Sequence, residues 1–147
     1  MNYFNQKGAE TILIQTIMTG PPLVEANPSD SIFLISNLMK ERKVSSTIII
    51  DQNYAPDGII TERDIVRRVI SNGKDPNITK STEIMSKPLI TVDESTSLYD
   101  VSKKMVKHKI RRLPVVKDNT LVGIVTVTDI IKYYYKKNKD DNLFAKA

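Results

Sequence analysis

Residues 123–130 read Gly-Ile-Val-Thr-Val-Thr-Asp-Ile, and residues 58–65 read Gly-Ile-Ile-Thr-Glu-Arg-Asp-Ile. The two stretches share a Gly, two apolar β-branched residues, a Thr and an Asp three positions later, and they stand 65 residues apart. The apolar run is typical of a buried strand, and Thr-x-x-Asp is typical of a helix start. Each stretch therefore predicts a strand that runs directly into a helix, and their match indicates an internal duplication.

Two further blocks repeat in the same order ahead of these stretches. Residues 17–21 (Ile-Met-Thr-Gly-Pro) recur as residues 84–88 (Ile-Met-Ser-Lys-Pro), 67 residues later. A serine, a methionine and a lysine recur 66 residues later, as Ser31, Met39 and Lys43 in one copy and Ser97, Met105 and Lys109 in the other. Small differences in loop length account for the drift in spacing, so we interpret the chain as two copies of one repeat.

Each copy predicts the order strand, helix, strand, strand, helix. In the second copy, Leu98, Val101 and Met105 recur at the period of a half-buried helix. The elements expected there are a strand over 89–92, a helix from 98, strands over 110–116 and 121–126, and a helix from about 127. Those expected in the first copy are a strand near 23–24, a helix over 31–43, strands over 44–51 and 58–61, and a helix from 62. We expect an α/β fold divided into an N-terminal segment (1–15), a first repeat (16–73), a linker (74–82), a second repeat (83–136) and a polar tail (137–147).

Composition and charge limit the kinds of ligand and metal site that the chain can have. The 147-residue chain has a formal net charge of +5, and residues 100–147 alone carry 12 Lys and Arg against five Asp and Glu. A basic half attracts the phosphates of a mononucleotide and of nucleic acid alike. Cysteine is absent and His108 is the single histidine, which excludes disulfides, cysteine-based zinc sites and a multi-histidine metal site within one subunit.

The motifs do not indicate an enzyme. The sequence has no Gly-x-x-x-x-Gly-Lys phosphate loop, and it offers no Ser-His-Asp set beyond chance. Residues 1–15 lack a basic stretch ahead of a long apolar run, so we expect a cytoplasmic protein that does not associate with membranes.

Three motifs together resemble the cystathionine-β-synthase (CBS) domain family over about residues 16–132. They are the Met-Ser/Thr-x-Pro openings, the Arg-Arg-Leu-Pro-Val-Val stretch over 111–116, and the Gly-x-x-Thr-x-x-Asp closings. The resemblance implies βαββα repeats that pack face to face with pseudo-twofold symmetry as one Bateman module. It also implies clefts between the repeats that often hold AMP, ADP, ATP or S-adenosylmethionine.

By position, the resemblance implies phosphate or ribose contact for the Thr and Asp of each closing motif. The full predicted nucleotide-binding set is Thr61, Arg63, Asp64, Thr91, Ile110, Arg111, Arg112, Pro114, Thr126 and Asp129. The chemistry is reasonable in itself, because free backbone N–H groups at a helix start favour a phosphate and an ionised aspartate accepts both hydrogens of a ribose cis-diol. The alternative is structural: Thr-x-x-Asp is also a capping box, and both roles can hold at one site.

The two predicted sites differ in charge. The second repeat has Arg111 and Arg112 where the first has Ser45 and Ser46, whereas Arg63 of the first repeat has a neutral threonine as its counterpart. Guanidinium groups suit bidentate phosphate contact. We therefore expect the second repeat to bind a nucleotide more tightly than the first.

The sequence thus predicts a non-catalytic regulatory module that binds an adenine nucleotide and signals to a protein partner. The alternatives are a basic nucleic-acid-binding protein and a ligand-free dimerisation scaffold. We also expect a homodimer formed through apolar residues of the closing helices, namely Ile65, Val66, Val69, Ile130 and Ile131.

Overall fold

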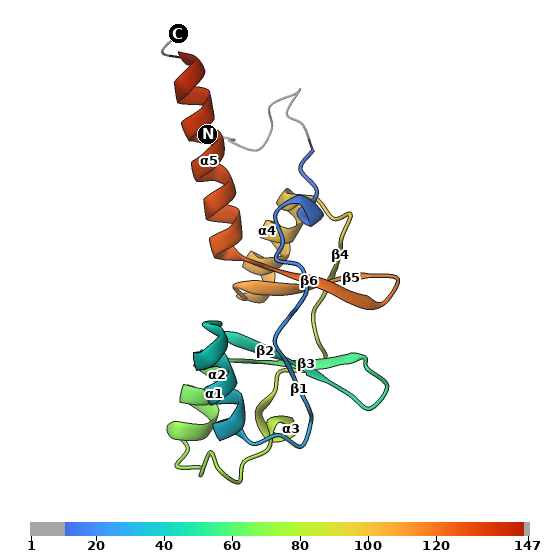
Figure 1. The fold of residues 1–147 in the computed structure, drawn as a ribbon, viewed down its shortest axis with the longest axis vertical. Helices are drawn as coiled ribbons and strands as arrows, with labels where there is room; N and C mark the ends of the chain where they lie inside the picture. Colours follow the sequence, from blue (N-terminus) through green and yellow to red (C-terminus); the bar gives the residue numbers. More distant parts are fainter. Residues whose placement is uncertain (1–10, 146–147) are drawn as a thin grey trace. The chain divides into compact units, whose positions relative to one another are not determined.

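The computed structural model describes residues 11–145 (Figure 1). The chain divides into two compact units, each described here by itself. The first-repeat unit spans Pro22–Ile90, and the second-repeat unit joins the part of the chain up to Pro21 with the part from Thr91 onward.

The first-repeat unit is built on a three-stranded sheet in the order β1-β2-β3. Strand β1 is parallel to β2, and β2 is antiparallel to β3. Its elements are β1 (Glu25–Ala26), α1 (Ile32–Arg42), β2 (Ser46–Ile50), β3 (Pro56–Thr61), α2 (Glu62–Ile65), the π-helical turn η2 (Val66–Ile70) and α3 (Ser81–Ile84). The core lies between the sheet and the helices, where Ile35, Ile49 and Ile60 are fully buried.

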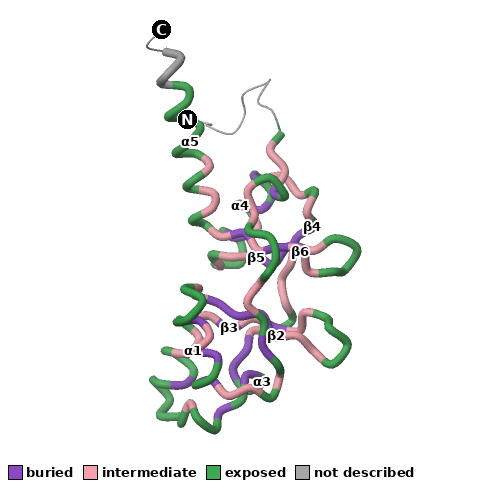
Figure 2. The backbone as a smooth tube through the Cα atoms, in the orientation of Figure 1, coloured by how far each residue is buried: buried purple, intermediate pink, exposed green. Residues whose placement is uncertain are grey.

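The second-repeat unit has the same plan, with a sheet in the order β4-β5-β6. Strand β4 is parallel to β5, and β5 is antiparallel to β6. Its elements are the 3₁₀ turn η1 (Ile14–Thr16), β4 (Val92–Asp93), α4 (Leu98–His108), β5 (Arg112–Lys117), β6 (Thr120–Thr126) and α5 (Val127–Ala145). Leu98, Val101 and Met105 are all buried, as their spacing predicted, and Figure 2 shows the buried residues concentrated on the sheets and on the helix faces that cover them.

The predicted fold class and the element order in both repeats are confirmed. The first strand of each repeat begins later than predicted, at Glu25 and at Val92, and the one in the second repeat is also shorter than predicted. The bounds of these strands are set by their pairing with β2 and β5. Only two residues of each strand pair with the neighbouring strand, although the apolar run in the sequence starts earlier. The first closing helix was predicted as one element from residue 62, but it changes to π-helical pairing at Val66.

The duplication extends to the caps of the long helices. Helix α1 begins after Ser31 and α4 after Ser97, and each serine hydroxyl accepts a hydrogen bond from a backbone N–H of the first helical turn. The two helices end at Lys43 and Lys109, both in the left-handed conformation with φ of 54°. Because a side chain disfavours this conformation, both repeats carry the same strained helix end.

The Met-x-x-Pro openings pair with the third strand of a sheet. Thr19 exchanges two backbone hydrogen bonds of 2.9 Å with Ile124 in β6. Ser86 does the same with Ile59 in β3, at 3.0 and 3.2 Å. The opening over residues 17–21 therefore belongs to the second-repeat unit, although the duplication places it at the start of the first repeat. The repeat boundaries themselves stay a prediction of the sequence.

Close packing of these openings explains the glycine that begins each closing motif. A Cβ on Gly123 would lie 2.8 Å from the carbonyl oxygen of Thr19 and 2.6 Å from the sulfur of Met18. A Cβ on Gly58 would lie 3.0 Å from the carbonyl oxygen of Ser86. Glycine is thus needed at both positions because another backbone segment lies directly against the strand.

Helix α5 continues well past the sheet of its own unit (Figure 1). It has 19 residues, and its outward side includes Ile131, which is 62% exposed, and Tyr135, which is 69% exposed. In the described part of the chain, no helix combines the length and the apolar character that crossing a membrane requires.

Candidate functional site

The sequence-predicted residues of the second repeat meet at one end of its sheet. Arg112 begins β5 and pairs in register with Thr126, the last residue of β6. The next backbone N–H, that of Val127, donates to the carbonyl oxygen of Arg111 at 2.9 Å. The strand-to-helix junction is therefore held directly against the start of β5, which brings both arginines beside the closing motif.

The remaining predicted residues of this repeat lie at or near the same end. Thr91 immediately precedes β4, and its carbonyl oxygen accepts a hydrogen bond of 2.7 Å from Nζ of Lys104. Pro114 is buried in β5. The backbone N–H of Ile110 donates to the carbonyl oxygen of Met105 at 3.0 Å, so Ile110 closes the end of α4 and is only half-buried.

Thr126 and Asp129 form a reciprocal cap at the start of α5. The backbone N–H and Oγ1 of Thr126 donate to Oδ2 of Asp129 at 2.8 and 3.0 Å. In return, the backbone N–H of Asp129 donates to Thr126 Oγ1 at 3.2 Å. The capping role considered for this motif is therefore present, and it uses only one of the two carboxylate oxygens. Among the described residues, Oδ1 of Asp129 has no hydrogen bond or ion pair.

The first repeat builds the same junction. Thr61 donates to Oδ2 of Asp64 through its backbone N–H at 2.8 Å and through Oγ1 at 2.9 Å. The backbone N–H of Glu62 donates to the carbonyl oxygen of Ser45 at 3.1 Å, in the place of the Val127–Arg111 bond of the other repeat. Ser45 is thus the structural counterpart of Arg111, as the sequence alignment predicted.

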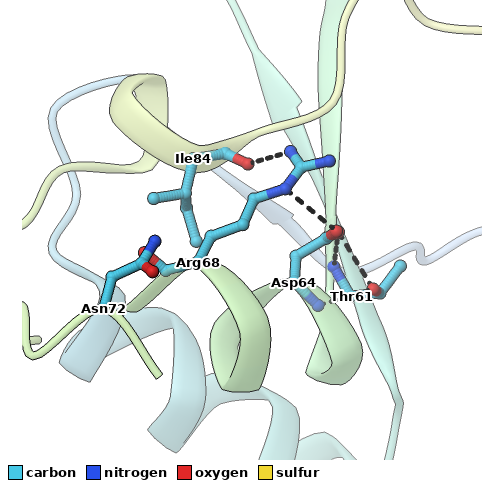
Figure 3. A network of polar contacts seen from close by, with 5 residues as sticks. All are labelled: Thr61, Asp64, Arg68, Asn72 and Ile84. Atoms are coloured by element: carbon cyan, nitrogen blue, oxygen red, sulfur yellow. Dashed lines mark hydrogen bonds and ion pairs between the residues drawn. The ribbon is translucent and has the colours of Figure 1, made fainter. Parts of the chain in front are cut away.

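The two junctions differ in what the second carboxylate oxygen contacts, and Figure 3 shows the junction of the first repeat. In the first repeat, Nε of Arg68 lies 3.7 Å from Oδ1 of Asp64. Nη1 of the same guanidinium donates to the carbonyl oxygen of Ile84 at 2.6 Å. In the second repeat, the residue four positions after Asp129 is Tyr133, which carries no positive charge.

Sequence reasoning missed Arg68 and Glu25. Arg68 follows Asp64 by four positions, which is the spacing of a helical ion pair, so the signal was present. Glu25 pairs with Ile48 of β2, which occupies the same register position as Pro114 of β5. Thr91 lies one residue before the β4 residue that pairs with Val115, so Glu25 is the counterpart of Thr91. The 66-residue offset between Ser31 and Ser97 gives the same match, so this signal was also present in the sequence.

Arg63 and Arg111 are both exposed to solvent, whereas Arg112 is half-buried and in contact with a neighbouring group. The described residues include no cluster of three or more His, Cys, Asp or Glu that is able to hold a metal ion. The candidate site therefore consists of a helix start, a carboxylate and two guanidinium groups, a set suited to ribose and phosphate.

The opposite end of the second-repeat sheet carries a different set of polar contacts. Nζ of Lys117 lies 2.9 Å from Oε1 of Glu94, and this hydrogen-bonded ion pair raises the pKa of Lys117. Hydrogen bonds from the side chain and the backbone of Ser95 lower the pKa of Asp93. Lys117 ends β5 and Arg112 begins it, so both pKa shifts lie away from the candidate site.

Comparison with known proteins agrees with this architecture. The family model described as the CBS domain matches residues 14–71 and again residues 81–136, which together are most of the chain. The chain belongs to the CBS domain family. It contains a tandem pair of CBS domains, the arrangement called a Bateman module.

Three proteins are similar to this CBS domain pair in sequence or in structure. An uncharacterised protein of Methanopyrus kandleri is 41% identical over 111 residues, or 75% of this chain, and the chain spans 57% of that relative's length. The CBS domain pair of protein MJ0100, solved in complex with 5′-methylthioadenosine and S-adenosyl-L-methionine, is 30% identical with a TM-score of 0.78, over 87% of this chain and 99% of that one. The hexameric CBS-CP12 protein from bloom-forming cyanobacteria is 35% identical with a TM-score of 0.77, over 84% of this chain and 72% of that one.

Proposed function

We propose that this CBS domain pair is a non-catalytic regulatory module that binds an adenosine-containing ligand at the second-repeat site. The ligands considered are AMP, ADP, ATP and S-adenosylmethionine. The observation that carries the proposal is the Asp129 carboxylate, because Thr126 holds Oδ2 and Oδ1 has no partner among the described residues.

A ribose cis-diol fits this carboxylate. An ionised carboxylate only accepts hydrogen bonds, and a cis-diol presents two hydroxyl donors on adjacent carbons. Thr126 fixes the orientation of the carboxylate before ligand arrives, which lowers the entropy cost of binding. The MJ0100 domain pair supports the same choice, since both of its ligands contain adenosine and neither contains a phosphate.

The charge of the site favours ligands that carry a phosphate. Arg111 precedes β5 and Arg112 begins it, next to the start of α5, and both arginine side chains and helix starts favour an anion. We therefore propose that AMP, ADP or ATP binds this site more tightly than S-adenosylmethionine, whose sulfonium carries a positive charge. Strengthening of AMP binding relative to 5′-methylthioadenosine as salt concentration falls is the expected signature.

The test is a titration of the purified protein with AMP, ATP, S-adenosylmethionine and 5′-methylthioadenosine. Heat of binding and a rise in melting temperature with ligand concentration support the proposal, because a ligand that binds only the folded state stabilises it. If none of the four compounds binds at millimolar concentration, the proposal is wrong.

We further propose that the module acts as a homodimer and passes its signal to a protein partner. The apolar residues available for dimerisation are Val66, Ile70 and Ile131, which are 56%, 60% and 62% exposed. Val69 was predicted to join this interface but is fully buried, because it packs in the core of the first-repeat unit. A mass by light scattering that stays monomeric well above micromolar concentration contradicts the dimer.

Nucleic-acid binding is a second candidate function because of α5. Its outward lysines are Lys132, Lys136, Lys137 and Lys139, and Tyr135 is exposed among them for stacking. Two acidic residues, Asp140 and Asp141, follow and weaken the patch. Binding of single-stranded RNA or DNA that falls steeply with salt, and that is lost on replacing these lysines by glutamine, favours this candidate.

A further inference from the structure

The first-repeat site already contains a cation from its own chain. Asp64 is well covered, with a side-chain exposure of 15%, and both of its carboxylate oxygens have protein partners. Thr61 contacts Oδ2, and the Arg68 guanidinium lies on the Oδ1 side (Figure 3). The oxygen that is open in Asp129 is therefore taken in Asp64.

A second contact holds Arg68 in this place. Its Nη1 donates a 2.6 Å hydrogen bond to the carbonyl oxygen of Ile84, the last residue of the short helix α3. This oxygen belongs to a helix end, where carbonyl groups lack partners within the helix. A ligand that displaced the Arg68 side chain from Asp64 would also have to break its hydrogen bond to Ile84. A ligand that left Arg68 in place would have to bind with a guanidinium group beside its ribose.

The local backbone around Arg68 differs from that of the second repeat. Arg68 lies in the π-helical turn η2, where the N–H of Ser71 bonds to the carbonyl oxygen of Val66, five residues back. Such turns widen the helix locally and are frequent at functional sites. The corresponding part of α5 is regular α-helix and carries Tyr133 in place of the arginine.

We propose that Arg68 is an internal occupant of the first-repeat site, which closes the ribose acceptor Asp64 and restricts ligand binding to the second repeat. The inference rests on the proposed function, since it assumes that the aspartate of the motif accepts the ribose. Beyond the proposed function, it identifies Arg68 as the residue that determines how many ligands each chain binds. The parent protein is expected to bind one adenosine ligand per chain.

The test compares ligand stoichiometry in the parent and in Arg68→Met by isothermal titration calorimetry. Methionine keeps the apolar stem of arginine but carries no N–H donor or charge. The probe is 5′-methylthioadenosine, because a ligand without phosphate or charge does not respond to the lost cation itself. Arg67→Met is the matched control, since Arg67 is exposed on the same turn and makes the same change in net charge.

The inference predicts one ligand per chain for the parent and for Arg67→Met, and two for Arg68→Met. The second binding event should vanish in the double variant Asp64→Asn/Arg68→Met, because the second ligand is expected to bind through the Asp64 carboxylate. Unchanged stoichiometry in a folded Arg68→Met protein, or two ligands per chain in the parent, overturns the inference while leaving the proposed function in place. Absence of binding in the parent and in all three variants overturns the proposed function, and the inference with it.

Discussion

Replacing Asp129 separates its two roles, because each role uses a different carboxylate oxygen. In Asp129→Asn, the amide oxygen can take the place of Oδ2 and accept from Thr126, while the amide NH₂ takes the place of Oδ1. The cap is then largely kept, but a ribose acceptor becomes a donor. Asp129→Ala removes both oxygens and with them both roles.

The structure sets the size of each effect. Asp129→Ala removes two hydrogen bonds from Thr126 at the start of α5, and losing such a cap costs about 0.5–2 kcal/mol of stability. Losing a hydrogen bond to a charged group costs about 1–3 kcal/mol, so ligand affinity should fall about 5- to 150-fold in both variants. Asp129→Asn should lose affinity with little loss of stability.

Asp64→Ala and Asp64→Asn are the matched controls. Asp64→Ala removes the same cap from the first repeat, and both variants remove a partly exposed ion pair to Arg68 that contributes about 0–1 kcal/mol. Asp64→Ala should therefore lower stability more than Asp64→Asn, and neither variant should lower affinity. The assays are urea unfolding and calorimetric titration with AMP on the same protein samples. If Asp129→Ala unfolds at a lower urea concentration but binds AMP as the parent does, the aspartate is only a cap and the ribose-acceptor role is wrong.

Three further comparisons test local features of the fold, all by urea unfolding. Gly123→Ala should cost about 1–3 kcal/mol and exceed the cost of Gly58→Ala, because its Cβ meets a backbone oxygen at 2.8 Å rather than 3.0 Å; equal costs would contradict this ranking, and no cost at either position would contradict the close approach. Thr47→Val should raise the free energy of unfolding by about 1 kcal/mol, since the fully buried Oγ1 has no hydrogen-bond partner in the described structure; a loss of stability would point to a bond that the structure lacks. Lys109→Gly should stabilise by about 0.5–1 kcal/mol by relieving the left-handed helix end, whereas Lys107→Gly inside α4 should destabilise by about 1 kcal/mol; the same sign for both would argue against strain at Lys109.

The parts of the fold that depend on local pattern were predictable. The spacing of Leu98, Val101 and Met105 identified the buried face of α4, and the Thr-x-x-Asp motifs correctly indicated helix caps. Such features are set by residues within a few positions of one another. The duplication then transferred the prediction from one repeat to the other.

The parts that depend on contacts between distant segments were not predictable. The packing of Thr19 against β6 links residues about a hundred positions apart, so nothing local assigned the first opening to the second-repeat unit. Arg68 lay at a recognisable helical spacing from Asp64, but its bond to the carbonyl oxygen of Ile84 appears only in three dimensions.

The most direct test of the central claim is an NMR titration of the ¹⁵N-labelled protein with 5′-methylthioadenosine. The backbone amides of Thr126 and Asp129 both take part in the cap whose carboxylate would accept the ribose. We predict that these two signals are among those that shift most and that they saturate together, while the amides of Thr61 and Asp64 stay unchanged. Shifts confined to Thr61 and Asp64, or saturating shifts that spare Thr126 and Asp129, would contradict the account.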